Sequence, residues 1–192
     1  MMGLALAAGL LAAGCDDSPA GLVCDPPADG ERGVPLVAVD GWTVASTADD
    51  PFAEFRPGED ISCPPTAREV EDLGGTNTYS VETGDCPYTT VQQPLLANVC
   101  EGDELYVWMW NFRLTAPEDA TAHLAVAIDG EIVWSRDFPI PSDSGLTTET
   151  VPFPHAFLAG AQVTFHVRNH GDNSYNLIQL SAVRGGVLPE VD

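Results

Sequence analysis

The stretch LYVWMWNFRLTAPEDATAHLAVAIDGEIVW, Leu105 to Trp134, decides the fold of this chain. It contains two dense apolar runs, rich in Val, Ile and aromatic residues, in which apolar side chains recur at every second position. This period is typical of β-strands, because successive side chains of a strand point to opposite faces. The dipeptide Asp129-Gly130 then supplies the residues that a two-residue hairpin turn prefers. The stretch therefore predicts antiparallel sheet.

The Asp129-Gly130 turn also predicts the register of its hairpin, with Ile128 opposite Glu131, Val126 opposite Val133 and Ala125 opposite Trp134. One face of this hairpin is then apolar and belongs to the core: Leu124, Val126, Ile128 and Val133. The other face is mixed: His123, Ala125, Ala127, Ile132, Trp134 and Arg136. Because Trp134 lies there among small and polar neighbours, one hypothesis is that it forms a shallow, solvent-facing ligand platform with His123 and Arg136, and the alternative is that it packs in the core.

The run before the hairpin has two faces of its own. The even positions share one face: Tyr106, Trp108, Trp110, Phe112 and Leu114. Because that face is apolar along its whole length, we expect Trp108 and Trp110 to pack in the core rather than bind a ligand.

Strand-like runs separated by turn residues recur along the rest of the chain. One exception is Thr66-Ala67-Arg68-Glu69, a capping-box pattern that precedes Gly74-Gly75 and predicts a short helix over 66–73. Seven to nine short strands with one helix, and no alternation of strands and helices, predict an all-β antiparallel sandwich. We expect this domain to cover residues 36–183 and to be followed by a frayed tail, 184–192.

The charge of the chain is extreme. Its 192 residues carry a formal net charge of −22, and the seven basic residues are all arginines. Such a surface repels phosphate backbones, so nucleic acid is excluded as a partner. We interpret the acidity as a solvated surface that favours solubility.

The N-terminus predicts export. Residues 1–14 are apolar and uncharged, too short to span a bilayer stably, and fit the hydrophobic region of a signal peptide. The run ends in LAAGC, residues 11–15, which resembles the lipobox of bacterial lipoproteins. This resemblance implies acylation of Cys15 and anchoring of the exported protein to a membrane of the cell envelope, in the periplasm or at the cell surface. Residues 15–35, rich in Pro and Gly, would then be a tether. An ordinary secretory signal, with Cys15 incidental, is the alternative.

Four further cysteines remain: Cys24, Cys63, Cys86 and Cys100. An even number in an exported chain predicts two disulfides. Four cysteines allow three pairings, and their spacing does not choose among them.

Four segments in the second half of the chain resemble the same group of domains. The segments Gly102–Val107, Leu124–Val133, Leu158–Phe165 and Asn176–Leu180 are similar to those of galactose-binding-domain-like jelly rolls, a group that includes many carbohydrate-binding modules. The resemblance implies a jelly-roll sandwich, a glycan ligand gripped by aromatic residues and a loop asparagine, and a structural calcium ion. Asn173 is the nearest match to that asparagine.

Metal and catalytic sites have less support. His166 and His170 lie four residues apart on a predicted strand, about 13 Å, which is too far for both to reach one ion without a sharp turn. Two acidic clusters offer oxygen ligands for Ca²⁺, and we interpret them as solvated loops: Asp49, Asp50 and Glu54, and Glu101, Asp103 and Glu104. The sequence has none of the common catalytic motifs that we sought, such as G-x-S-x-G, H-E-x-x-H or a P-loop.

The sequence thus predicts a lipid-anchored, exported β-sandwich that acts as a non-catalytic binding or envelope-structural module, with carbohydrate as the leading ligand. The alternative is a zinc- or copper-binding periplasmic protein or enzyme that uses His123, His166 and His170.

Overall fold

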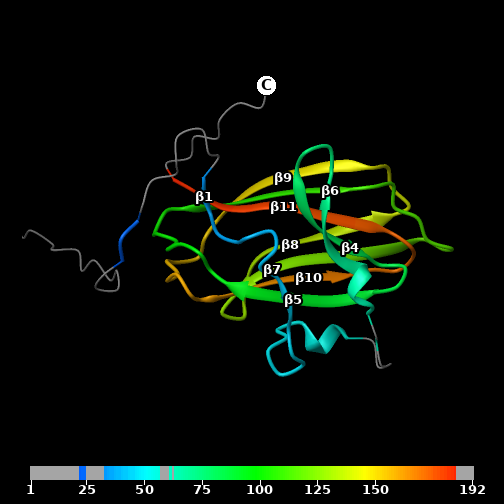
Figure 1. The fold of residues 1–192 in the computed structure, drawn as a ribbon, viewed down its shortest axis with the longest axis horizontal. Coiled ribbons are helices and arrows are strands. Elements are labelled where there is room, and N and C mark those ends of the chain that lie inside the picture. Colours follow the sequence, from blue (N-terminus) through cyan, green and yellow to red (C-terminus); the bar gives the residue numbers. More distant parts are fainter. Residues whose placement is uncertain (1–21, 25–32, 57–60, 62, 185–192) are drawn as a thin grey trace, which may run out of the picture.

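Two antiparallel sheets form the domain in the computed structural model, which describes residues 22–24, 33–56, 61 and 63–184. Sheet A has the order β3-β4-β11-β6-β9, with β1 paired to β11, and sheet B has the order β2-β5-β10-β7-β8. The two sheets lie one above the other (Figure 1). The strands of sheet A are β1 (Val34–Pro35), β3 (Arg68–Asp72), β4 (Asn77–Glu82), β6 (Glu104–Asn111), β9 (Gly145–Pro152) and β11 (Ser174–Val183). Those of sheet B are β2 (Thr43–Val44), β5 (Tyr88–Pro94), β7 (Ala120–Ile128), β8 (Glu131–Ile140) and β10 (Gln162–Arg168).

From β4 onward the chain crosses between the sheets at every connection except the β7–β8 hairpin. This path is that of an antiparallel jelly roll, so the predicted all-β fold class is confirmed. Each crossing places sequence neighbours on opposite layers and pairs strands that are distant in the chain. The central strand β11 consequently pairs with segments as distant in the chain as β1, where Val34 lies opposite Ala182.

The core fills the space between the sheets. From sheet A it contains Tyr79, Val81, Leu105, Val107, Met109, Tyr175, Leu177 and Leu180. From sheet B it contains Val91, Leu124, Val126, Ile128, Trp134, Val163, Phe165 and Val167. These sets alternate along their strands, as expected of strands with one buried face. Burial of this apolar surface provides the main driving force for folding.

The prediction that Trp108 and Trp110 pack in the core is wrong. On β6 it is Leu105, Val107 and Met109 that are fully buried, whereas the side chain of Phe112 is 47% exposed. Both faces of this strand are apolar, so alternation alone could not say which of them meets the second sheet. Trp108 and Trp110 therefore lie on the outer face of sheet A.

The hypothesis that Trp134 faces the solvent is also wrong. Ile128 does lie opposite Glu131, and Ala127 lies opposite Ile132, but a bulge after this pair places Val126 opposite Trp134. One inserted residue exchanges the faces of all residues beyond it. Trp134 consequently points into the core and is only 4% exposed.

The predicted helix over 66–73 is wrong as well. A 3₁₀ turn, η2 (Pro65–Ala67), is followed directly by strand β3, which pairs with β4 through Glu69–Ser80 and Glu71–Thr78. Pairing with β4 provides backbone hydrogen bonds along the segment, and this tertiary contact outweighs the local capping pattern.

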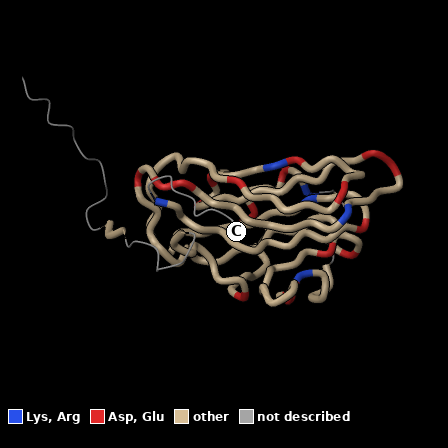
Figure 2. The backbone as a smooth tube through the Cα atoms, turned by 90° about the horizontal axis from the view of Figure 1, so that it is seen from above, with Lys and Arg blue, Asp and Glu red and all other residues tan. Residues whose placement is uncertain are grey.

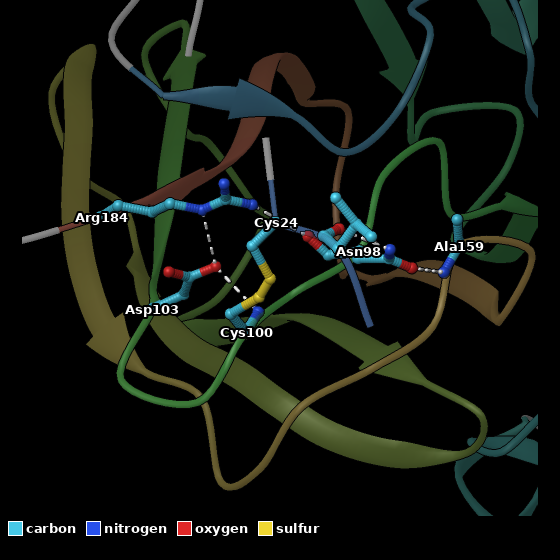
Figure 3. The surroundings of a disulfide bond; sticks show 7 residues. Cys24, Asn98, Cys100, Asp103, Ala159 and Arg184 are labelled. Carbon is cyan, nitrogen blue, oxygen red and sulfur yellow. Dashed lines mark hydrogen bonds and ion pairs between the residues drawn. A yellow bond between two sulfur atoms is a disulfide. The ribbon is translucent and has the colours of Figure 1, made fainter. Parts of the chain in front are cut away.

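The cysteines pair as Cys24–Cys100 and Cys63–Cys86, which confirms that two disulfides form. Near the first disulfide, Asn98 donates to the carbonyl of Val23 and accepts from the amide of Ala159, each at 2.8 Å. Asp103 accepts from the amide of Cys100 and from Arg184 (Figure 3). The segment at Cys24 and the end of β11 are thus fastened to the same loop, at one end of the sandwich.

The predicted signal peptide, the acylated Cys15 and most of the tether and tail lie outside the described residues. Within the described part of the chain, no helix is long and apolar enough to cross a membrane. Acidic residues lie all around the molecule, many of them in loops, and basic residues are few (Figure 2).

We expect Cys63→Ser with Cys86→Ser to lower the free energy of unfolding by roughly 3 kcal/mol, because this bridge closes a loop of 23 residues in the unfolded chain. Urea unfolding followed by tryptophan fluorescence measures the change. A loss below about 1 kcal/mol would contradict the expectation, and the wild type in reducing buffer serves as the comparison.

Candidate functional site

An apolar groove of about 450 Å³ crosses the outer face of sheet A. Strand β6 provides its aromatic floor, β9 and β11 provide one aliphatic residue each, and the loop between β3 and β4 provides a wall. The lining residues are Leu73, Gly74, Thr76, Thr78, Trp108, Trp110, Phe112, Leu146 and Ile178. Large apolar patches on a surface indicate a binding site more often than isolated apolar residues do.

The register of the sheet places the groove residues side by side. Trp110 lies between Asn176 of β11 and Leu146 of β9, and Trp108 lies between Gln179 and Thr148. A bulge in β11 at Ile178 separates these two rows. Since directly opposite residues of an antiparallel pair point to the same side, all of these side chains share the outer face.

The last two aromatic rings of the groove, those of Trp110 and Phe112, are nearly perpendicular to each other. The rings of Trp110 and Phe112 have centroids 6.3 Å apart and an interplanar angle of 86°. Phe112 and Leu146 are 47% and 53% exposed, and the two tryptophans are half-buried. Flat apolar faces turned to solvent are suited to stacking against the C–H faces of sugar rings.

The wall of the groove is a tight turn. The amide of Leu73 donates to the carbonyl of Thr76 at 2.9 Å, and the amide of Gly75 donates to Oδ1 of Asp72 at 2.8 Å. Gly74 and Gly75 have φ angles of 68° and 94°, which residues with a side chain rarely adopt. This turn stands above the sheet at the top of Figure 1.

Beside the aromatic floor lies a polar strip on β4 and β11. Thr78 donates to Oδ1 of Asn176 at 3.4 Å, and Nδ2 of Asn176 donates to Ser174 at 3.3 Å. Thr78 and Asn176 are fully buried, although they belong to the outer face. These buried groups bond to one another and support the floor, whereas the polar side chains that reach solvent beside it are Thr76, Thr148 and Gln179. An apolar floor next to such hydroxyl and amide groups is the combination that small-molecule sites use for affinity and orientation.

The predicted platform of Trp134 and Arg136 has a structural role instead. The indole of Trp134 donates to Oε2 of Glu149 at 2.6 Å, and Arg136 binds Oε1 of the same carboxylate. Glu149 belongs to β9 of sheet A, whereas Trp134 and Arg136 belong to β8 of sheet B. These contacts therefore join the two sheets at their β8–β9 edges.

Asn173 and His123 are likewise engaged within the protein. Asn173 accepts from the amide of Thr115 at 2.6 Å and donates to the carbonyl of the same residue at 3.0 Å. His123 donates through Nδ1 to Asp137 at 2.7 Å. The structure brings neither of them to the groove of sheet A.

The predicted histidine trio does not converge. His123 and His166 have ring centroids 6.2 Å apart, whereas His170 lies exposed in the loop after β10. Among the described residues, no group of three or more His, Cys, Asp or Glu side chains is placed to hold a metal ion. Of the acidic clusters considered for calcium, Asp50 and Asp103 accept hydrogen bonds from neighbouring protein groups.

The outer face of sheet B is closed by the loop 46–56, which includes η1 (Ala53–Phe55) and lies below β5 in Figure 1. Phe52 is fully buried against Ala125 and Ala127 and stacks on His166 with centroids 4.4 Å apart. Asp50 accepts from Tyr88 at 2.7 Å and from Thr90 at 2.9 Å. Burial alone would raise the pKa of Asp50, but the hydrogen bonds from Tyr88, Phe52, Thr90 and Arg56 outweigh it, and the pKa is lowered.

His166 is held neutral under this loop. The single hydroxyl proton of Thr90 is donated to Asp50, so Nδ1 of His166 carries a proton and donates to Thr90 at 2.9 Å. Its Nε2 has no hydrogen-bond partner among the described residues. Burial, assisted by His123 and by the positive charge of Arg168 and opposed by the negative charge of Asp50, lowers the pKa of His166 to about 3.

Sequence reasoning missed the groove because it assigned Trp108 and Trp110 to the core. A usable signal was present in the alternate positions of the same strand, which are equally apolar: Leu105, Val107 and Met109. In a two-layer sandwich only one face of a strand can enter the core. A strand that is apolar on both faces must therefore expose one of them or cover it.

No protein-family model matches this sequence, and no curated protein is significantly similar to it. Solved structures of similar fold include a carbohydrate-binding module of family 28 specific for non-crystalline cellulose, with 12% identity, 84% of this chain and 98% of that chain covered, and a TM-score of 0.48. Another is the N-terminal cellulose-binding domain of β-1,4-glucanase C from Cellulomonas fimi, with 15% identity, 69% and 95% coverage, and a TM-score of 0.38. A family 4 module gives 14% identity, 59% and 87% coverage, and a TM-score of 0.39. No function is transferred from them, because one fold hosts many functions.

We expect stability to decline as the pH falls below about 6.5, because unfolding releases His166 to take up a proton that it resists in the fold. The stabilisation that neutral His166 provides is fully present above its unfolded pKa of about 6.5. It is lost as the pH falls from there toward the folded pKa of about 3, at up to about 1.4 kcal/mol per pH unit. Unfolding free energies measured between pH 7 and pH 4 should show a smaller slope in His166→Gln than in the wild type. The control His170→Gln should keep the wild-type slope, and an unchanged slope in His166→Gln would refute the assignment.

Proposed function

We propose that this protein binds glycans through the groove of sheet A and acts as a non-catalytic recognition module. The observation that carries the proposal is the row of Trp108, Trp110 and Phe112 on an outer sheet face, where these residues contribute no packing between the sheets. Exposing three large aromatic residues is unfavourable in water unless a ligand covers them. Flat aromatic faces beside hydroxyl and amide groups are complementary to sugars, which have apolar C–H faces and polar rims.

The shape of the groove favours a single glycan chain over a flat crystalline surface. The turn at Gly74 and Gly75 rises on one side, and the perpendicular ring of Phe112 interrupts the flat surface that Trp110 begins. A planar crystal face would touch the wall before it reached the tryptophans. A separate oligosaccharide chain can lie between these features.

We further propose that the protein is exported and held to a membrane of the bacterial cell envelope by lipid on Cys15. The lipobox-like sequence supports this proposal, as do two disulfides, which persist in oxidising compartments. Cys24, nine residues after Cys15, is bonded to Cys100 just before the start of β6. Phe112 follows the opposite end of β6, so the groove would extend away from the anchored end of the domain.

Trp110→Ala should weaken binding to soluble glycans on the order of 30-fold, because the change removes a central stacking surface. Affinity electrophoresis against soluble cellulose, xylan, galactan and chitin oligomers measures the effect. Phe55→Ala is the matched control, since Phe55 is 42% exposed but lies over sheet B. Equal binding by Trp110→Ala and wild type, with both proteins folded, would contradict the proposed site.

Cys15→Ala should abolish incorporation of radiolabelled palmitate and release the protein from the membrane fraction of expressing bacteria. Two or more acyl chains hold a protein stably, and an unacylated variant has no such attachment. Cys24→Ser, which leaves the lipobox intact, should remain labelled. Equal labelling of Cys15→Ala and wild type would end the lipoprotein proposal without affecting the glycan site.

A further inference from the structure

The outer face of sheet A has a one-sided charge distribution. Because paired residues point to the same side, Glu69 opposite Ser80 and Glu71 opposite Thr78 both belong to this face. Its carboxylates are Glu69 and Glu71 on β3, Glu82 on β4 and Glu104 on β6. The described strands of sheet A place no basic side chain on this face, since Arg68 lies opposite the core residue Val81.

The described arginines are engaged elsewhere, with one exception. Arg68 donates to Thr89 and to the carbonyl of Cys63, so its charge is held at the edge toward sheet B. Arg56 binds Asp50, and Arg136 binds Glu149. Arg168 lies over the ring of Phe55, and Arg184 binds Asp103. The exception is Arg113, which follows Phe112 beyond the end of β6. The described strands of sheet A thus give their outer face four carboxylates and no basic side chain, and Arg113, beside Phe112, is the described cation that can offset this charge.

Carboxylates and tryptophans lie on one path across the strands. One row of the outer face reads Glu69, Ser80, Asn176, Trp110 and Leu146 from β3 to β9. Neighbouring strands are about 4.8 Å apart, so Glu69 is about 14 Å from Trp110 across three strand spacings. A short oligosaccharide stacked on Trp110 and lying across the strands would reach the β3 carboxylates.

We propose that the glycan bound in this groove carries protonated amino groups, as oligomers of glucosamine with free amines do. The inference rests on the proposed glycan site and specifies its ligand class. Ammonium groups would be attracted by Glu69 and Glu71. An ammonium group over an indole face gains a cation–π attraction that a neutral sugar lacks. Glycans with carboxylate or sulfate groups are repelled by the same face.

Isothermal titration with glucosamine hexamer, N-acetylglucosamine hexamer and cellohexaose tests the inference at low salt and at a mildly acidic pH that keeps the sugar amines protonated. The glucosamine hexamer should bind three- to tenfold more tightly than either neutral hexamer, which is the gain expected from one or two exposed ion pairs. This preference should shrink as salt is added, because exposed charges are screened.

Glu69→Gln with Glu71→Gln should remove the preference and leave the affinity for neutral hexamers unchanged. The double variant Glu118→Gln with Asp119→Asn makes the same change in net charge in an exposed loop between β6 and β7, and should keep the preference. An equal loss in both double variants would overturn the inference, since attraction would then come from the overall charge of the protein.

The two proposals fail in different ways. Neutral hexamers that bind through Trp110 as tightly as the glucosamine hexamer would overturn the amino-sugar inference and leave the glycan site intact. If no hexamer binds, and Trp110→Ala alters nothing in the broader glycan panel, the glycan site itself is refuted.

Discussion

The contact between the inner faces of the two sheets is the constraint on which the rest of the structure depends. Leu105, Val107 and Met109 of β6 are fully buried in the core opposite sheet B, whose inner face includes Phe165 and Val126. Once these positions are committed to the core, the pleat of β6 turns Trp108 and Trp110 outward. The groove is thus a direct geometric consequence of core packing.

The two outer faces of the sandwich differ in how they are covered. Over sheet B, the loop 46–56 inserts Phe52 against two alanines and His166, and Asp50 gathers hydrogen bonds from Tyr88 and Thr90. The loop therefore covers the apolar residues of that face and provides hydrogen-bond partners for its polar groups. Over sheet A, an apolar groove remains beside a strip of hydrogen-bonded polar groups. This difference is why the proposed ligand site lies on sheet A, although sheet B contains more histidine and arginine.

Polar contacts at the ends and edges of the sandwich position the groove. Glu149 binds Trp134 and Arg136 and so joins β9 to β8. At one end, the Cys24–Cys100 disulfide and the Asp103–Arg184 ion pair fasten the first and last described segments to one loop. A tether at this end would leave the wall at Gly74, the tryptophans and the acidic strand β3 free to meet a glycan.

The sequence by itself determined the sheet architecture, the turn at Asp129-Gly130 and the presence of two disulfides, because period-two patterns, turn residues and an even cysteine number are local or countable signals. It did not determine which face of β6 is buried, since both faces are apolar. It could not reveal the bulge that turns Trp134 inward, or the pairing with β4 that makes 68–72 a strand. Those features were decided by tertiary structure, because each depends on which distant strand lies alongside, and a shift of one residue exchanges the core and surface faces of a strand.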